Sequence, residues 1–228
     1  MDNLTLVIPA KNESESLPQV LDDLIKFKLK TIIVLEKEDI KTIESINKYQ
    51  NIIILYQKNK GYGDALIEGI NKVNTEYFCI FNADGSFLSS ELKKMHNLLN
   101  DNSTDFVFGS RYMPGASSED DTIVTLIGNK LFSFIGNFFF FLGISDILYT
   151  YVMGSTQKAK YLDLKSKDFA FCVELPIKAK KNDYRLVSSP SNEKPRIAGK
   201  KKVNAFKDGF MILIAMIKLF FFNKSKIK

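Results

Sequence analysis

The chain has 228 residues, of which 45% are hydrophobic and 25% charged, a balance that is ordinary for a globular protein and excludes wholesale disorder. Its two cysteines, Cys79 and Cys172, are too few for a disulfide framework and lack the CxxC spacing, so we expect both to be buried and reduced. The net charge of +6 arises at the C-terminal end, because residues 194–228 carry ten Lys or Arg against Asp208 alone. These basic residues flank apolar segments and no nucleic-acid motif accompanies them, so no nucleic-acid partner is predicted.

The first half of the chain alternates short β-rich runs with helical patterns. Strands are predicted at Leu4–Ile8, Thr31–Leu35, Ile52–Tyr56, Tyr77–Phe81 and Asp105–Phe108. Helices are predicted at Leu17–Lys28, Ile40–Tyr49, Tyr62–Lys72 and Glu91–Leu99. This alternation predicts an α/β fold with a mainly parallel, Rossmann-like sheet, in which ligands bind at the carboxyl ends of the strands. The N-terminus leads directly into a strand without the pattern of a signal peptide, so we expect a cytoplasmic protein.

The second half is less regular. The patterns predict a long apolar helix over Thr122–Leu142, a short strand over Tyr149–Met153, a helix over Phe169–Lys181 and a strand over Arg185–Ser188. A basic loop, Lys194–Lys202, precedes an apolar segment, Phe206–Phe222. We expect a catalytic domain over residues 1–202 and a basic, apolar, membrane-associating segment over residues 203–228.

Three loops at predicted strand ends carry residues suited to chemistry. The run Phe81–Ser86, FNADGS, places Asp84 and other hard oxygen ligands at the end of a strand, as a Mg²⁺ or Mn²⁺ site requires, although the same residues also form simple turns. The run Lys58–Ala65 opens a helix with glycines, which suits an anion but also a plain helix start. Arg111, in Gly109–Tyr112, could grip a phosphate or lie on the surface.

Together with further motifs, these loops resemble the family-two glycosyltransferases of GT-A fold, and among them the polyprenyl-phosphate sugar synthases such as the dolichyl-phosphate mannose synthases. The resemblance runs over nearly the whole chain. It rests on VIPAKNE at Val7–Glu13, NKGYGDAL at Asn59–Leu66, FNADGS at Phe81–Ser86, GSRYMPG at Gly109–Gly115, the stretch Phe169–Pro190 and PRIAGKKKVN at Pro195–Asn204.

The resemblance implies roles for individual residues. The donor nucleotide would be held by Pro9, Ala10, Lys11, Glu13, Glu36, Lys60 and Gly61. The metal would be held by Asn82, Asp84 and Ser86, and the acceptor phosphate by Arg111, Lys130, Arg196 and Lys202. Two positions depart from the family pattern: Asn82 stands where an aspartate is usual, and Glu36 begins a run that replaces the usual Asp-Gly-Ser. Because Asn82 keeps a carbonyl ligand but lacks the charge, we expect weaker metal binding and not its loss, whereas Glu36 can still accept hydrogen bonds from a base. With both departures, the family pattern does not identify the donor.

The implied reaction is inverting transfer of a sugar from a GDP- or UDP-sugar, in cell-envelope or glycan biosynthesis, with the metal neutralising the leaving diphosphate. A hydroxyl acceptor would need a carboxylate base, for which Asp146 and Glu174 are the catalytic candidates; alternatively, Asp146 caps a turn and Glu174 lies on a solvated helix face. A lipid phosphate is already ionised and needs cations instead. The resemblance supplies such cations in Arg111, Lys130, Arg196 and Lys202, which favours polyprenyl phosphate as the acceptor.

The apolar segments also favour a lipid acceptor. Phe138–Phe141 has more consecutive aromatic residues than one core-facing stripe needs, and Gly209–Phe222 is apolar except for Lys218. Lys207 and Lys218 lie about three helical turns apart and so share a face. We expect a helix at the inner membrane surface, and thus a peripheral protein, with core or subunit packing as the alternative. A hydroxyl-acceptor transferase and a non-catalytic nucleotide-sugar binder remain rival functions, and no oligomeric state is predicted.

Overall fold

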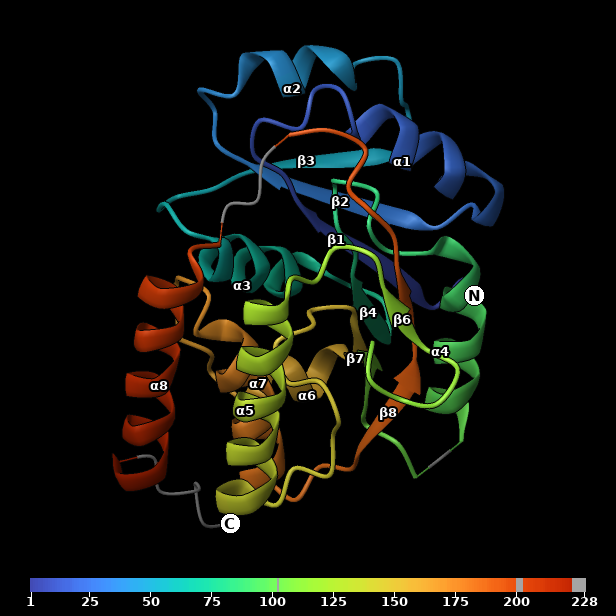
Figure 1. Ribbon diagram of the computed structural model, residues 1–228. Helices are drawn as coiled ribbons and strands as arrows, with labels where there is room; N and C mark the ends of the chain where they lie inside the picture. Colours follow the sequence, from blue (N-terminus) through green and yellow to red (C-terminus); the bar gives the residue numbers. More distant parts are fainter. Residues whose placement is uncertain (102, 200–202, 223–228) are drawn as a thin grey trace.

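A seven-stranded sheet forms the centre of the molecule (Figure 1). The computed structural model describes residues 1–101, 103–199 and 203–222. The strands follow the order β3-β2-β1-β4-β7-β5-β8, and all neighbouring pairs are parallel except those that β7 makes with β4 and β5. The strands are β1 (Leu4–Pro9), β2 (Lys30–Leu35), β3 (Ile52–Tyr56), β4 (Tyr77–Ile80), β5 (Phe106–Ser110), β7 (Val152–Ser155) and β8 (Leu186–Pro190). The predicted mainly parallel α/β class is confirmed.

Helices cover both faces of this sheet (Figure 1). They are α1 (Leu17–Leu24), α2 (Ile40–Ser45), α3 (Tyr62–Lys72), α4 (Leu92–Asn100), α5 (Ile123–Phe140), α6 (Thr156–Tyr161), α7 (Phe171–Lys181) and α8 (Ala205–Phe222). Successive strand residues point to opposite faces, so β1 contributes Val7 to one apolar cluster and Leu6 and Ile8 to the other. The first cluster includes residues of α3 and of α5 to α8, and the second includes residues of α1 and α4.

Most predicted elements are present, with differences at their ends. β3 and α3 have the predicted bounds. α2 instead stops at Ser45, because the backbone N–H groups of Ile46 and Asn47 donate to the carbonyls three residues earlier and not four. β7 starts three residues later than expected. The helix α6 and a small parallel ladder of β6 (Ser117–Ser118) with β9 (Asn192–Glu193) were not predicted. β3 is an edge strand and only half-buried.

The start of α3 is held by a loop from far along the chain. The buried Glu174 of α7 accepts hydrogen bonds from the backbone N–H groups of Lys165 and Ser166, at 2.7–3.0 Å, and pairs with Lys178 at 2.6 Å. The loop thus fixed lies so close to Gly63 that a Cβ there would be 2.2 Å from the Ser166 carbonyl oxygen. Glu174 therefore shapes the glycine-rich helix start, and the alternative that it lies on a solvated helix face is wrong.

Gly63→Ala should destabilise the protein, since the loop backbone cannot yield as a flexible side chain would. We expect a loss of about 1–3 kcal/mol in the free energy of unfolding, measured in urea. Gly128→Ala is the matched control, because a Cβ at this α5 position meets nothing within 4 Å. It should stabilise the helix by about 0.5–1 kcal/mol. Equal effects of the two substitutions would contradict the close approach at Gly63.

Candidate active site

The loop after β4 presents Asp84 at the carboxyl edge of the sheet. Asp84 Oδ1 accepts a hydrogen bond from the Ser86 backbone N–H at 3.0 Å, and Asn82 Nδ2 donates to Ser86 Oγ at 3.2 Å. Gly85 has φ +82°, and this left-handed conformation allows the tight turn. The hydrogen bonds fix the loop and leave Asp84 Oδ2 and Asn82 Oδ1 as the oxygens that a cation could use.

The segment after β9 lies against this loop. The backbone N–H of Lys194 donates to the Ser86 carbonyl at 3.0 Å, and that of Ile197 donates to the Asp84 carbonyl at 2.8 Å. Between these two anchors, the Arg196 guanidinium lies 2.9 Å from Asp120 Oδ2 and 3.7 Å from Asp84 Oδ2. The predicted basic loop, Lys194–Lys202, therefore brings the positive charge of Arg196 beside Asp84.

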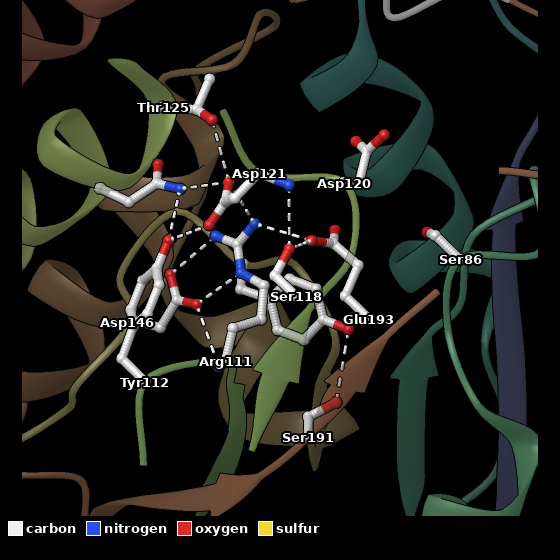
Figure 2. A network of polar contacts seen from close by, with 12 residues as sticks. Ser86, Arg111, Tyr112, Ser118, Asp120, Asp121, Thr125, Asp146, Ser191 and Glu193 are labelled. Carbon is white, nitrogen blue, oxygen red and sulfur yellow. Dashed lines mark hydrogen bonds and ion pairs between the residues drawn. The ribbon is translucent and has the colours of Figure 1, made fainter. Parts of the chain in front are cut away.

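Arg111 follows the last residue of β5, and its side chain is buried among three carboxylates (Figure 2). It makes a two-pronged pair with Asp146, with Nε–Oδ2 at 2.7 Å and Nη2–Oδ1 at 3.0 Å. Its Nη1 lies 3.2 Å from Glu193 Oε2 and 3.6 Å from Asp121 Oδ1. The guanidinium also packs 4.6 Å from the ring centroid of Tyr149. Arg111 is thus fully engaged inside the protein.

Burial shifts the pKa values of this cluster in a consistent way. Burial alone would lower the pKa of Arg111, but the nearby acidic groups, Asp146 first and then Glu193, together outweigh burial and hold that pKa above the ordinary value. Burial raises the pKa values of Asp146 and Glu193, and the nearby Arg111 charge offsets only part of the rise. The cluster therefore keeps a positive guanidinium and surrounds it with carboxylates that are costly to keep charged.

A second group of contacts organises the loops after β1 and β2. Lys11 Nζ pairs with Glu36 Oε1 at 2.8 Å. The backbone N–H groups of Asn12 and Glu13 donate to Asp39 Oδ2 at 2.6 Å and to Thr42 Oγ1 at 2.9 Å, respectively. Asp39 also caps α2. The start of α2 thereby fixes the PAKNE loop beside Glu36, where the family resemblance predicts that the donor nucleotide binds.

The structure joins some of the predicted site residues and places others apart. Ser86 contacts both Asn82 and Asp84, Arg196 lies beside Asp84, and Asp120 and Asp121 connect these residues to the Arg111 cluster. The ends of β1 and β2 and the loops after them carry Pro9, Ala10, Lys11, Glu13 and Glu36. Lys60 and Gly61 precede α3, and Lys130 is exposed on α5 near the Tyr112 ring. Glu174 holds a loop elsewhere, and Lys202 lies outside the described residues.

Three carboxylates of the site were missed by the sequence reasoning: Asp120, Asp121 and Glu193. The acidic run Glu119-Asp120-Asp121 directly before the α5 cap was a local signal that could have been used. Glu193 gives no such signal, because its role depends on β9 pairing with β6.

Comparison with known proteins identifies the chain's family. The sequence profile of Glycosyl transferase family 2 matches residues 5–163. A low-salt glycan biosynthesis hexosyltransferase of Haloferax volcanii is 25% identical over 217 residues, which cover 91% of this chain and 51% of that protein, so the chain spans about half of this relative. A UDP-N-acetylglucosamine–dolichyl-phosphate N-acetylglucosaminyltransferase of Methanococcus voltae is 27% identical, with 81% of this chain and 83% of the relative covered.

The fold has close counterparts among solved structures. Glucosyl-3-phosphoglycerate synthase from Mycobacterium tuberculosis, in complex with Mn²⁺, UDP and glucosyl-3-phosphoglycerate, superimposes with a TM-score of 0.73 at 10% identity. The match covers 98% of this chain and 82% of that enzyme. The GT-A-like sheet and the extent of the family profile agree with each other, and the chain belongs to glycosyl transferase family 2.

Proposed function

We propose that this glycosyltransferase moves a sugar from a GDP- or UDP-sugar to a polyprenyl phosphate at a membrane surface, with inversion at the anomeric carbon. The Methanococcus voltae relative is named for transfer to dolichyl phosphate, and a polyprenol monophosphomannose synthase of Mycolicibacterium smegmatis is 24% identical, with 87% of this chain and 80% of that protein covered. The observation that carries the proposal is that both candidate bases, Asp146 and Glu174, are committed to buried structural contacts.

The residues around Asp84 fit a divalent cation. Asp84 Oδ2, the Asn82 amide oxygen and Ser86 Oγ are hard oxygens, which Mg²⁺ and Mn²⁺ prefer. Among the described residues no three Asp, Glu, His or Cys side chains form a metal cage, so phosphate and water would supply the remaining ligands. Around this loop five carboxylates face two guanidinium groups, an excess of negative charge that a cation would offset. When bound, the cation would stabilise the charge that develops on the leaving diphosphate.

The acceptor side suits an anion that is already charged. A hydroxyl nucleophile must lose its proton, yet both oxygens of the buried Asp146 accept from Arg111, and Glu174 accepts from two backbone N–H groups on another part of the molecule. A phosphate monoester needs no such base. Arg196 and the exposed Lys130 would hold it, while Arg111 positions the surrounding loops.

The helices α5 and α8 would place the site at a membrane. They pack together, and both expose large apolar side chains. The exposed side chains include Ile123, Ile127, Leu131, Phe134 and Phe138 of α5 and Phe206, Phe210, Ile217 and Phe221 of α8. By length and composition α5 alone among the described helices could cross a bilayer, with a mean hydropathy of 1.4 over 18 residues. Its packing on α7 and α8 favours a helix that lies in the interface, with the exposed Lys207 and Lys218 near anionic lipid.

A donor-by-acceptor screen tests the reaction directly. GDP-mannose, UDP-glucose and UDP-N-acetylglucosamine would each be paired with polyprenyl phosphate or with hydroxyl acceptors, in the presence of Mn²⁺ or Mg²⁺. We expect labelled sugar in the lipid phase, lost with EDTA and reduced by about a hundredfold or more in Asp84→Ala, since metal stabilisation of the transition state is worth several kcal/mol. Turnover with hydroxyl acceptors alone would refute the lipid phosphate, and donor binding without any turnover would favour a non-catalytic binder.

Two substitutions separate the acceptor classes. With polyprenyl phosphate, Arg196→Ala should lower kcat/KM for the acceptor by about tenfold or more, because a hydrogen bond to a charged group contributes roughly 1.5–3 kcal/mol. Asp146→Asn should act mainly on folding and cost about 3 kcal/mol in urea unfolding, since it breaks a buried ion pair. Activity per folded molecule decides between them: if Asp146→Asn loses more than Arg196→Ala, Asp146 is the base for a hydroxyl acceptor.

Membrane binding is tested by flotation with vesicles that contain anionic lipid, at low salt. Replacing Phe134, Phe138, Phe206 and Phe210 with serine should lower the bound fraction at least about tenfold, because each buried side chain of this size contributes roughly 1.5–3 kcal/mol. The matched control replaces Ile25 and Ile40, which are 65% and 54% exposed and lie near α1 and α2. Binding that is unchanged in the Phe variant, or equally weakened in the control, would contradict the assignment of this surface.

A further inference from the structure

Arg196 is shared between two carboxylates of the site. Its Nη2 lies 2.9 Å from Asp120 Oδ2, and its Nη1 lies 3.7 Å from Asp84 Oδ2. The side chains are 17–22% exposed, so water screens the pairs only in part. Asp120 thus holds the guanidinium closely, and Asp84 holds it at longer range.

The backbone fixes Arg196 at this place. Hydrogen bonds from Lys194 N to the Ser86 carbonyl and from Ile197 N to the Asp84 carbonyl attach the segment to the Asp84 loop on both sides of Arg196. The Ile197 side chain also fills the space beside Gly85, where a Cβ would come within 2.4 Å of its terminal methyl carbon. The backbone of Arg196 therefore stays beside the Asp84 loop whether or not the ion pair is formed.

Asp84 has one carboxylate oxygen to offer. Its Oδ1 accepts from the Ser86 N–H, which leaves Oδ2, the oxygen that faces Arg196. A guanidinium and a divalent cation on one oxygen would repel each other at contact distance. Asn82 is neutral and supplies no second negative charge at this loop. The guanidinium and a divalent cation would therefore both depend on the single charge of Asp84.

We propose that Arg196 is the resident counter-ion of Asp84 and competes there with the divalent cation, an inference that rests on the metal role proposed above for Asp84. Arg196 leaves Asp84 when the cation binds and remains attached to Asp120. Its Nη1 is then available to the acceptor phosphate.

Mn²⁺ titration of the whole protein without nucleotide, followed by the EPR signal of free Mn²⁺, tests the competition apart from catalysis. Arg196→Gln should tighten Mn²⁺ binding by about two- to fivefold, the range of a partly exposed ion pair. Lys194→Gln removes the same charge two residues away on an exposed side chain and is the control for charge alone. It should change the affinity less.

A double-mutant cycle with Asp120 sharpens the test. Asp120→Asn removes the carboxylate 2.9 Å from Arg196, so Arg196 should pair more strongly with Asp84 and Mn²⁺ binding should weaken. If Asp120 acts through Arg196, this effect disappears in the Arg196→Gln background.

Equal effects of Arg196→Gln and Lys194→Gln, or an Asp120 effect that persists without Arg196, would overturn the competition. Unchanged Mn²⁺ binding by Asp84→Ala would overturn the metal site itself. Absence of sugar transfer in the screen, with the Mn²⁺ results as expected, would refute the proposed reaction and leave this inference standing.

Discussion

The buried charge of Arg111 is the constraint on which the site depends. A guanidinium that is 8% exposed is stable only where carboxylates surround it, because an unpaired buried ion costs several kcal/mol. Its partners come from three separate segments: Asp121 before α5, Asp146 between α5 and β7, and Glu193 in β9. The pairing of these carboxylates with Arg111 therefore holds three segments of the second half of the chain together at the carboxyl end of β5.

The same constraint explains why the two arginines of the site differ. Arg111 is enclosed and held by a two-pronged pair, so its charge serves the architecture. Arg196 is half-buried, and its segment is anchored through the backbone, so its side chain can change partners without unfolding the loop. A lysine with a single point of attachment would not replace the fork that Arg111 uses. Arg111 thus holds the segments of the site together, whereas the Arg196 side chain can change its partner.

Local patterns predicted the elements whose structure is local. The Ile52–Tyr56 strand and the Tyr62–Lys72 helix have the predicted bounds because continuous apolar runs and glycine punctuation set them. The antiparallel direction of β7 and the β6–β9 ladder arise from pairing between residues at least 44 positions apart, which no local sequence pattern predicts. For the same reason Asp84 was recognised from its motif, whereas Asp121 and Glu193, two of the three partners of Arg111, were not. Glu174 was predicted as a candidate base, with a solvated helix face as the alternative, and neither prediction included its loop contacts, which the helical pattern does not contain.

Helix α5 joins the charged site to the apolar surface, and this continuity bears on the choice of acceptor. Its N-cap, Thr122, directly follows Asp121, which accepts from Thr125 in the first turn of the helix. Ile123, exposed in that turn, begins an apolar stripe that continues at intervals of three or four residues to Phe138. A lipid phosphate would use both features at once, with its charged end at Arg196 and its chain along the stripe. A water-soluble sugar acceptor would leave the stripe exposed to water, where large apolar patches are disfavoured.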